Sequence, residues 1–211
     1  VLERYTSGRS FGVLKGLLFG DTSEIGEDDY KKFKNSGIIH IFAVSGYNIW
    51  LLFYILSKAF FFLNNHKKSK TFLIIALLGM YTAMSGASPS VTRAFLMASL
   101  ILLGRLKERR ADPLTSLAIS GFVILIFSPL SIMDVGFLLS FASTASIILL
   151  FPVLKNVKLP LRGRIMDMVL LSLSVQIGML PVILYYFNSF PVFVIAANLI
   201  ILTIISAVTV I

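Results

Sequence analysis

Residues 135–154 read VGFLLSFASTASIILLFPVL, a run of 20 positions without a charged side chain. A helix that crosses the hydrocarbon core of a bilayer needs about 20 mostly apolar residues. The run therefore predicts a transmembrane helix. Its small Ser, Thr and Ala side chains are typical of a helix that packs closely against other helices in a membrane.

Six further segments have the same apolar character, and the sequence predicts an all-α fold. It is a polytopic transmembrane helix bundle of about seven spans. The six segments are residues 38–63, 71–88, 91–104, 114–133, 165–187 and 191–211. The third is short, so we expect its helix to begin before Pro89 or to be partly re-entrant. Proline stops helices, so Pro129, Pro152 and Pro191 are expected at helix ends, and Pro181 is expected to kink the sixth span.

The composition is typical of a membrane protein, and it excludes several kinds of reactive and metal-binding site. Hydrophobic residues make up 57% of the 211 residues and charged residues 14%, whereas a soluble domain carries roughly 25% charged residues. The absence of Cys excludes disulfides, thiol nucleophiles and cysteine metal sites. Two His leave little material for a zinc site. We expect no metal and no cofactor.

Residues 1–37 differ from the rest. The apolar stretch 11–19 is too short to span a membrane, and acidic residues precede basic ones between Ser23 and Gly37. That order complements a helix dipole, and Gly37 suits a C-cap. We predict an extracytoplasmic amphipathic surface segment. The chain begins with Val1 and ends in an uncharged run, so we expect it to be a piece of a longer protein.

The positive charges gather in alternate loops. Eleven lie after the first, third and fifth spans: Lys67, Lys68, Lys70, Arg105, Lys107, Arg109, Arg110, Lys155, Lys158, Arg162 and Arg164. The opposite short loops hold none. Positive loops face the cytoplasm. A seven-span count gives this asymmetry without exception and places residues 1–37 outside the cytoplasm.

Polar residues within the spans are costly in hydrocarbon, so each is a candidate functional residue. The candidates are His40, Ser45, Gly46, Asn48, Arg93, Asp134, Ser140, Gln176 and Asn198. His40 and Asn48 share a helix face, which lines an aqueous path or forms interhelical hydrogen bonds. Arg93 either has a function or extends to the outer surface. Asp134 either caps a helix or pairs with Arg93.

Five separated motifs resemble the ComEC-type competence proteins, inner-membrane channels for DNA uptake in natural transformation. They are GDTS at 20–23 before a charged helix, HIFAVSGYNI at 40–49, SVTRAFLMA at 90–98, DVGFLLSFA at 134–142, and Gln176 to Pro181 with Asn198. Many members have His at the position of Asn48, and this chain departs from that pattern.

The resemblance implies that residues 38–211 are a transmembrane competence domain, truncated at its C-terminus, in the inner (plasma) membrane of a bacterium. The expected partners are single-stranded DNA, the lipid bilayer and other proteins of the competence machinery. Longer members carry an oligonucleotide-binding-like domain and a metallo-β-lactamase-like domain. Neither is visible here, so we expect no catalytic residues and no enzyme activity in this chain.

Two other functions stay open from the residues alone. A small-solute or ion permease would gather His40, Asn48, Arg93 and Asp134 into one compact site. An intramembrane hydrolase would use Ser45 as nucleophile. It would need a base beside Ser45, and His40 on the same helix is poorly placed to reach it.

Overall fold

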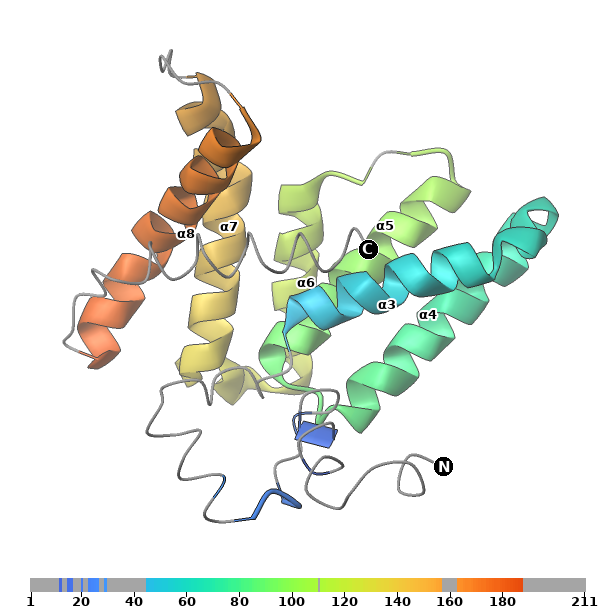
Figure 1. The fold of residues 1–211 in the computed structure, drawn as a ribbon, viewed down its shortest axis with the longest axis horizontal. Helices are drawn as coiled ribbons and strands as arrows, with labels where there is room; N and C mark the ends of the chain where they lie inside the picture. Colours follow the sequence, from blue (N-terminus) through green and yellow to red (C-terminus); the bar gives the residue numbers. More distant parts are fainter. Residues whose placement is uncertain are drawn as a thin grey trace. The chain divides into compact units, whose positions relative to one another are not determined.

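The regular elements of the computed structural model are all helical in the part of the chain that it describes (Figure 1). That part comprises residues 45–109, 111–156 and 163–187, together with Gly12, Lys15, Gly16, Gly20, residues 23–26 and Asp29. The chain divides into two compact units, Val1–Asp112 and Pro113–Ile211. The predicted all-α class is therefore confirmed, and each unit is described by itself.

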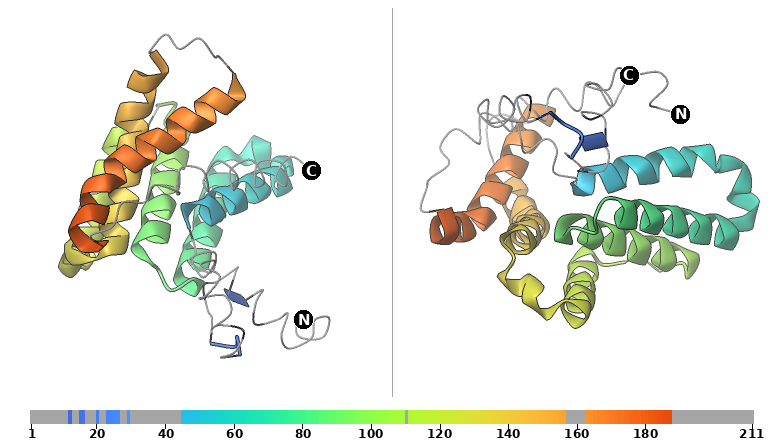
Figure 2. Two further views of the ribbon diagram at one scale, coloured as in Figure 1. Left: turned by 60° about the vertical axis from the view of Figure 1, so that its left-hand side comes forward. Right: turned by 90° about the horizontal axis from the view of Figure 1, so that it is seen from below.

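The first unit contains α3 (Gly46–Ala59), the 3-10 helix η3 (Phe61–His66), α4 (Lys67–Met84) and α5 (Pro89–Leu106). The three α-helices contact one another in every pairing and lie side by side in Figure 2. They share one apolar core, made of Ile49 from α3, Ile74 and Leu78 from α4, and Val91 and Leu102 from α5. This core fixes which faces of the helices meet.

Glycine permits close approach inside this unit. A Cβ added to Gly79 of α4 would lie 3.3 Å from Phe95 Cζ of α5. The link between α4 and α5 is a tight turn in which Gly86 has φ 76° and Ala87 has φ 48°. The Ala87 N–H donates to the Thr82 carbonyl at 3.0 Å, and the Thr92 hydroxyl donates to the Ala87 carbonyl at 3.0 Å. The turn thus joins the end of α4 to the start of α5.

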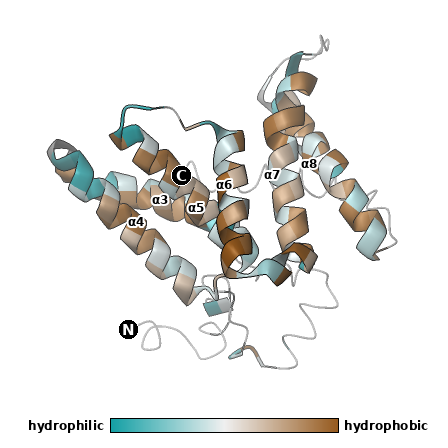
Figure 3. Ribbon diagram, turned by 180° about the vertical axis from the view of Figure 1, so that it is seen from behind, coloured by the Kyte–Doolittle hydropathy of each residue, from teal (hydrophilic) through white to brown (hydrophobic). Residues whose placement is uncertain are grey.

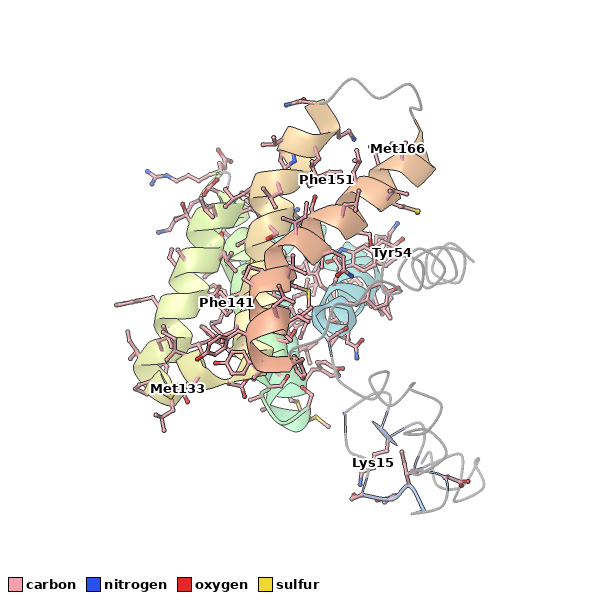
Figure 4. The ribbon with its side chains drawn as sticks, turned by 90° about the vertical axis from the view of Figure 1, so that its left-hand side faces the viewer. Lys15, Tyr54, Met133, Phe141, Phe151 and Met166 are labelled. Atoms are coloured by element: carbon pink, nitrogen blue, oxygen red, sulfur yellow. The ribbon has the colours of Figure 1, made fainter. Side chains whose placement is uncertain are left out.

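The second unit contains α6 (Pro113–Phe127), the 3-10 helix η4 (Pro129–Met133), α7 (Val135–Asn156) and α8 (Arg164–Phe187). Phe141, labelled on α7 in Figure 4, has its Cε1 only 3.0 Å from a Cβ added to Gly121 of α6. Its ring also stacks on Phe137, with 4.3 Å between the centroids. Aromatic rings of α7 therefore fill the space that a glycine leaves on α6.

Small residues bring α7 and α8 together. A Cβ added to Gly178 of α8 would collide with the Ser146 side chain of α7 and lie 3.1 Å from the Ala142 carbonyl oxygen. At one end of the pair, Lys155 Nζ lies 2.8 Å from Asp167 Oδ2. Close packing of small residues is a usual way to join helices within a membrane.

Three described helices are long and apolar enough to cross a membrane, judged by length and composition: Pro89–Leu106, Val135–Asn156 and Met166–Phe187. The count of seven is not confirmed. The first predicted span contains a described helix of 14 residues, α3, about 21 Å long at 1.5 Å per residue. The fourth contains the 15-residue α6 followed by η4, and the seventh lies outside the described residues. Figure 3 shows hydrophobic residues along α6 and hydrophilic residues at several helix ends.

Two predicted boundaries are wrong. Helix α5 starts at Pro89 itself, at its first position, rather than before it. Proline fits there because its ring already has a helical φ and its missing N–H would have no partner within the helix. Pro152 lies inside α7, which continues to Asn156. The helix thus extends by about one turn beyond a residue that removes one backbone hydrogen bond. Pro181 lies inside α8, where it was expected.

Candidate functional site at the start of helix α3

Three helices of the first unit contribute polar side chains to one place. Asn48, in the first turn of α3, donates from Nδ2 to the Tyr81 hydroxyl of α4 at 3.3 Å. Both residues are half-buried. Ile49 follows Asn48 and has an exposed fraction of only 1%. The buried Ile49 therefore directs the start of α3 into the unit and brings Asn48 to Tyr81.

Arg93 of α5 lies against the start of α3. A Cβ added to Gly46 would lie 3.3 Å from Arg93 Nη2 and 3.3 Å from Ala94 Cβ. The guanidinium therefore occupies space that any larger residue at position 46 would claim. The Nε of Arg93 is buried and has no hydrogen-bond partner among the described residues. Arg93 thus has unused hydrogen-bonding capacity beside Gly46. We name Gly46, Asn48, Tyr81 and Arg93 the Arg93 cluster.

The electrostatics of this cluster favour an anion. The N-cap residues are Ser45 for α3 and Ser88 for α5, and in the described structure neither side chain makes a capping hydrogen bond. Neither helix has an acidic residue in its first turn. The N-terminal end of a helix carries a positive partial charge. The contact with Gly46 places the guanidinium at the first turn of α3, and Arg93 itself is the fifth residue of α5, just after the first turn of that helix.

A row of aromatic rings follows the exposed face of α3. The Tyr47 and Trp50 rings stack with 5.8 Å between centroids, and the Trp50 and Tyr54 rings do the same at 5.8 Å. Lys58 Nζ then lies 5.8 Å from the centroid of Tyr54, which Figure 4 labels on α3. Trp50 is 49% exposed and Tyr54 is 46% exposed. We name Tyr47, Trp50, Tyr54 and Lys58 the aromatic row.

The aromatic row was not predicted from the sequence, although a signal for it is present. Its members follow one another at intervals of three, four and four residues. That spacing places them on one side of a helix. Composition alone does not show whether an aromatic ring is exposed or lies in the core.

Two other candidates, Asp134 and Ser140, lie in the second unit. Asp134 Oδ1 accepts a hydrogen bond from the Phe137 backbone N–H at 2.8 Å, which is the geometry of a helix N-cap. Ser140 is buried and its Oγ has no hydrogen-bond partner among the described residues, whereas its backbone carbonyl accepts hydrogen bonds from the Ser143 and Thr144 hydroxyls at 3.0 and 2.9 Å. Gln176 is half-buried on α8.

The remaining candidates stay predictions. His40 and Asn198 lie outside the described residues. Arg93 belongs to the first unit and Asp134 to the second, so their pairing is not tested. The hydrolase alternative needs a base beside Ser45. His66 ends η3, which follows α3 in the chain, whereas Ser45 precedes α3, so the two residues lie at opposite ends of that helix. No group of three or more His, Cys, Asp or Glu in the described ranges is arranged to hold a metal ion.

Comparison with known proteins agrees with the motifs. ComE operon protein 3 of Bacillus subtilis (strain 168) is 31% identical over 194 residues, which cover 90% of this chain and 24% of that protein. The chain thus spans about a quarter of the length of that relative. No solved structure matches the chain. The family described as Competence protein matches residues 17–211. The chain therefore belongs to the competence protein family.

Proposed function

We propose that this chain is the membrane part of a DNA-uptake channel. It passes single-stranded DNA across the inner (cytoplasmic) membrane of a bacterium during natural transformation. Membership of the competence protein family supports the DNA substrate. The observation that carries the proposal is the position of Arg93, whose guanidinium lies against Gly46 with a buried Nε that has no hydrogen-bond partner in the described structure.

An Arg in this position suits a phosphodiester group. The planar guanidinium can present two N–H groups to two phosphate oxygens, and helix N-termini are favourable places for phosphate. A strand carries one negative charge per nucleotide, so each phosphate in turn would meet the same cluster. Asn48 would offer an amide beside it. In this role the Arg93 cluster orders the backbone of the strand without reading its sequence.

The aromatic row suits the other half of a nucleotide. Sites for single-stranded nucleic acid combine positive charge for the backbone with aromatic rings for the bases. Tyr47 follows Gly46 directly, so the row starts beside the Arg93 cluster and continues along α3 to Lys58. The proposal therefore places phosphates at the start of α3 and bases along its exposed face. We propose no catalytic step for this chain.

Transformation by purified DNA tests this function. The host is a transformable strain that lacks its own copy of the protein. It receives a full-length protein that contains this chain. Asn48→Leu removes the amide while keeping a side chain of similar size. We expect transformation to fall at least tenfold, with protein abundance and membrane insertion unchanged.

The matched control is Phe53→Leu, which replaces one apolar residue of α3 by another and should change transformation little. Normal transformation in Asn48→Leu, with the protein present, would remove Asn48 from the path of the strand. Loss of growth on one solute, with normal transformation, would favour a permease instead.

A further inference from the structure

A second positively charged site lies at the other end of α3, away from the Arg93 cluster. It is a surface cavity of about 210 Å³ where the first turn of α4 meets the last turn of α5. Its lining consists of three cationic side chains, one hydroxyl and two leucines: Lys67, Lys70, Arg105, Thr71, Leu102 and Leu106. The proposed function does not use this cavity.

The cations of the cavity differ in how they are held. Lys70 Nζ donates to the Ser57 carbonyl near the end of α3 at 3.0 Å, which fixes its ammonium group at the cavity. Lys67 and Arg105 are exposed. The structure shows no ion pair from either of them to a carboxylate in the described ranges. No acidic residue is among the described residues that line the cavity. In the described ranges, no carboxylate therefore neutralises Lys67 or Arg105.

The backbone adds to this charge. Lys67 and Lys70 lie in the first turn of the 18-residue α4, which has no acidic residue there, and its N-cap His66 makes no side-chain capping hydrogen bond. The N-terminal end of a helix carries a positive partial charge and favours an anion. Three cationic side chains and one helix N-terminus thus border the same space.

The apolar part of the cavity lining indicates what kind of molecule carries the anionic group. Leu102 is 7% exposed and belongs to the core of the unit, and Leu106 is half-buried. Both lie in the last turns of α5, one of the helices apolar enough to span a membrane. The end of such a helix is where the hydrocarbon of a bilayer meets its headgroups. A ligand with a phosphate and an attached acyl chain matches both parts of the lining.

We propose that this cavity binds the phosphate headgroup of an anionic phospholipid. Lys67, Lys70 and Arg105 contact the phosphate, and the first part of an acyl chain lies along Leu102 and Leu106. The bound lipid anchors the α4–α5 end of the first unit at one leaflet. The proposal is independent of the DNA function and would stand if that function were wrong.

Native mass spectrometry of the purified full-length protein tests the site. The probes are phosphatidylglycerol and, as the neutral-headgroup comparison, phosphatidylcholine. We expect preferential retention of phosphatidylglycerol. The variant Lys67→Gln with Arg105→Gln should weaken that retention at least tenfold, since each basic residue near an anionic lipid contributes about fivefold to affinity. The conservative variant Lys67→Arg with Arg105→Lys should retain it.

The matched control is Lys68→Gln with Lys107→Gln, which removes the same charge from exposed neighbours outside the cavity. It should leave lipid retention nearly unchanged. Equal weakening by both pairs would show non-specific attraction and overturn the site. Displacement of the lipid by millimolar inorganic phosphate would overturn the lipid as the source of the phosphate. Displacement of the lipid by a short single-stranded oligonucleotide, if lost in the variant Lys67→Gln with Arg105→Gln, would show that the cavity binds nucleic acid. That result would overturn the lipid proposal.

Discussion

Arg93 Nη2 lies 3.3 Å from the place where Gly46 would carry a Cβ. This contact joins the first turn of α3 to Arg93, the fifth residue of α5. It brings a guanidinium, two helix N-termini and the Asn48 amide within one small region of the first unit. Such proximity favours glycine at position 46, because a Cβ there would make tight contacts with Arg93 and Ala94. The absence of a side chain at Gly46 is therefore part of the site.

The first prediction concerns the size of residue 46. Gly46→Ala should change stability by less than about 1 kcal/mol, because alanine stabilises a helix over glycine by a similar amount to the cost of a tight contact. Gly46→Leu should displace Arg93 and lower transformation severely, since the added carbons have no space beside Ala94. Thermal unfolding in detergent and transformation assays measure the two effects.

Gly26→Ala is the control for this pair, because nothing lies within 4 Å of a Cβ built there. If Gly46→Leu has the unfolding temperature and the transformation frequency of the unsubstituted protein, the close approach of Arg93 to position 46 has no role in stability or DNA uptake.

The second prediction concerns the contact between α7 and α8. Gly178→Ala should destabilise the second unit by at least about 2 kcal/mol, because the new methyl group collides with Ser146. Adding Ser146→Gly should restore much of the loss by vacating the space. Thermal unfolding of the single and double variants measures this coupling. Gly163→Ala, with open space around it, is the control, and additive losses in the double variant would show that the two residues do not meet.

The third prediction separates the two interpretations of Asp134. As an N-cap, Asp134 is replaceable by Asn, whose side-chain oxygen also accepts the Phe137 N–H. Asp134→Ala should cost about 1 kcal/mol. As the partner of Arg93, Asp134 would instead need its charge. The unfolding temperature of Asp134→Asn should therefore be close to that of the unsubstituted protein. A decrease equal to that of Asp134→Ala would support the ion pair.

The fourth prediction concerns topology. The distribution of basic loops places His66 at the cytoplasmic face and Met133 at the outer face. Both side chains are exposed, and the chain has no native Cys. Single Cys substitutions at these positions, treated with an impermeant thiol reagent on intact cells, should react at residue 133 and not at residue 66. The reverse pattern would invert the orientation.

The sequence was sufficient for the long apolar helices and insufficient for contacts between helices. The predicted spans 91–104, 135–154 and 165–187 agree with Pro89–Leu106, Val135–Asn156 and Arg164–Phe187 within about two residues at each end. Length and apolar composition decide these helices locally. The first span was predicted to end at residue 63, four residues after the end of α3, because hydrophobicity continues through Phe60, Phe61 and Phe62, where the chain leaves the α-helix for η3.

The candidate site shows the same division. Asn48 and Arg93 were chosen as candidates because polar groups are costly in hydrocarbon. Helical periodicity indicates on which face of its helix a residue lies, but not which residue of another helix it contacts. The bond from Asn48 to Tyr81 joins residues 33 positions apart, and the approach of Arg93 to Gly46 depends on tertiary packing. Neither follows from a single helix.

The central claim is that the transported strand passes along the exposed face of α3. Site-specific photocrosslinking tests it most directly. A photoreactive phenylalanine derivative replaces Trp50 in the full-length protein, and cells receive labelled DNA during uptake. The control position is Phe127, an aromatic residue at the end of α6 that is 85% exposed. We predict covalent DNA at position 50, dependent on Arg93, and none at position 127. Equal labelling at both positions, or no labelling at position 50 in cells that still take up DNA, would contradict the account.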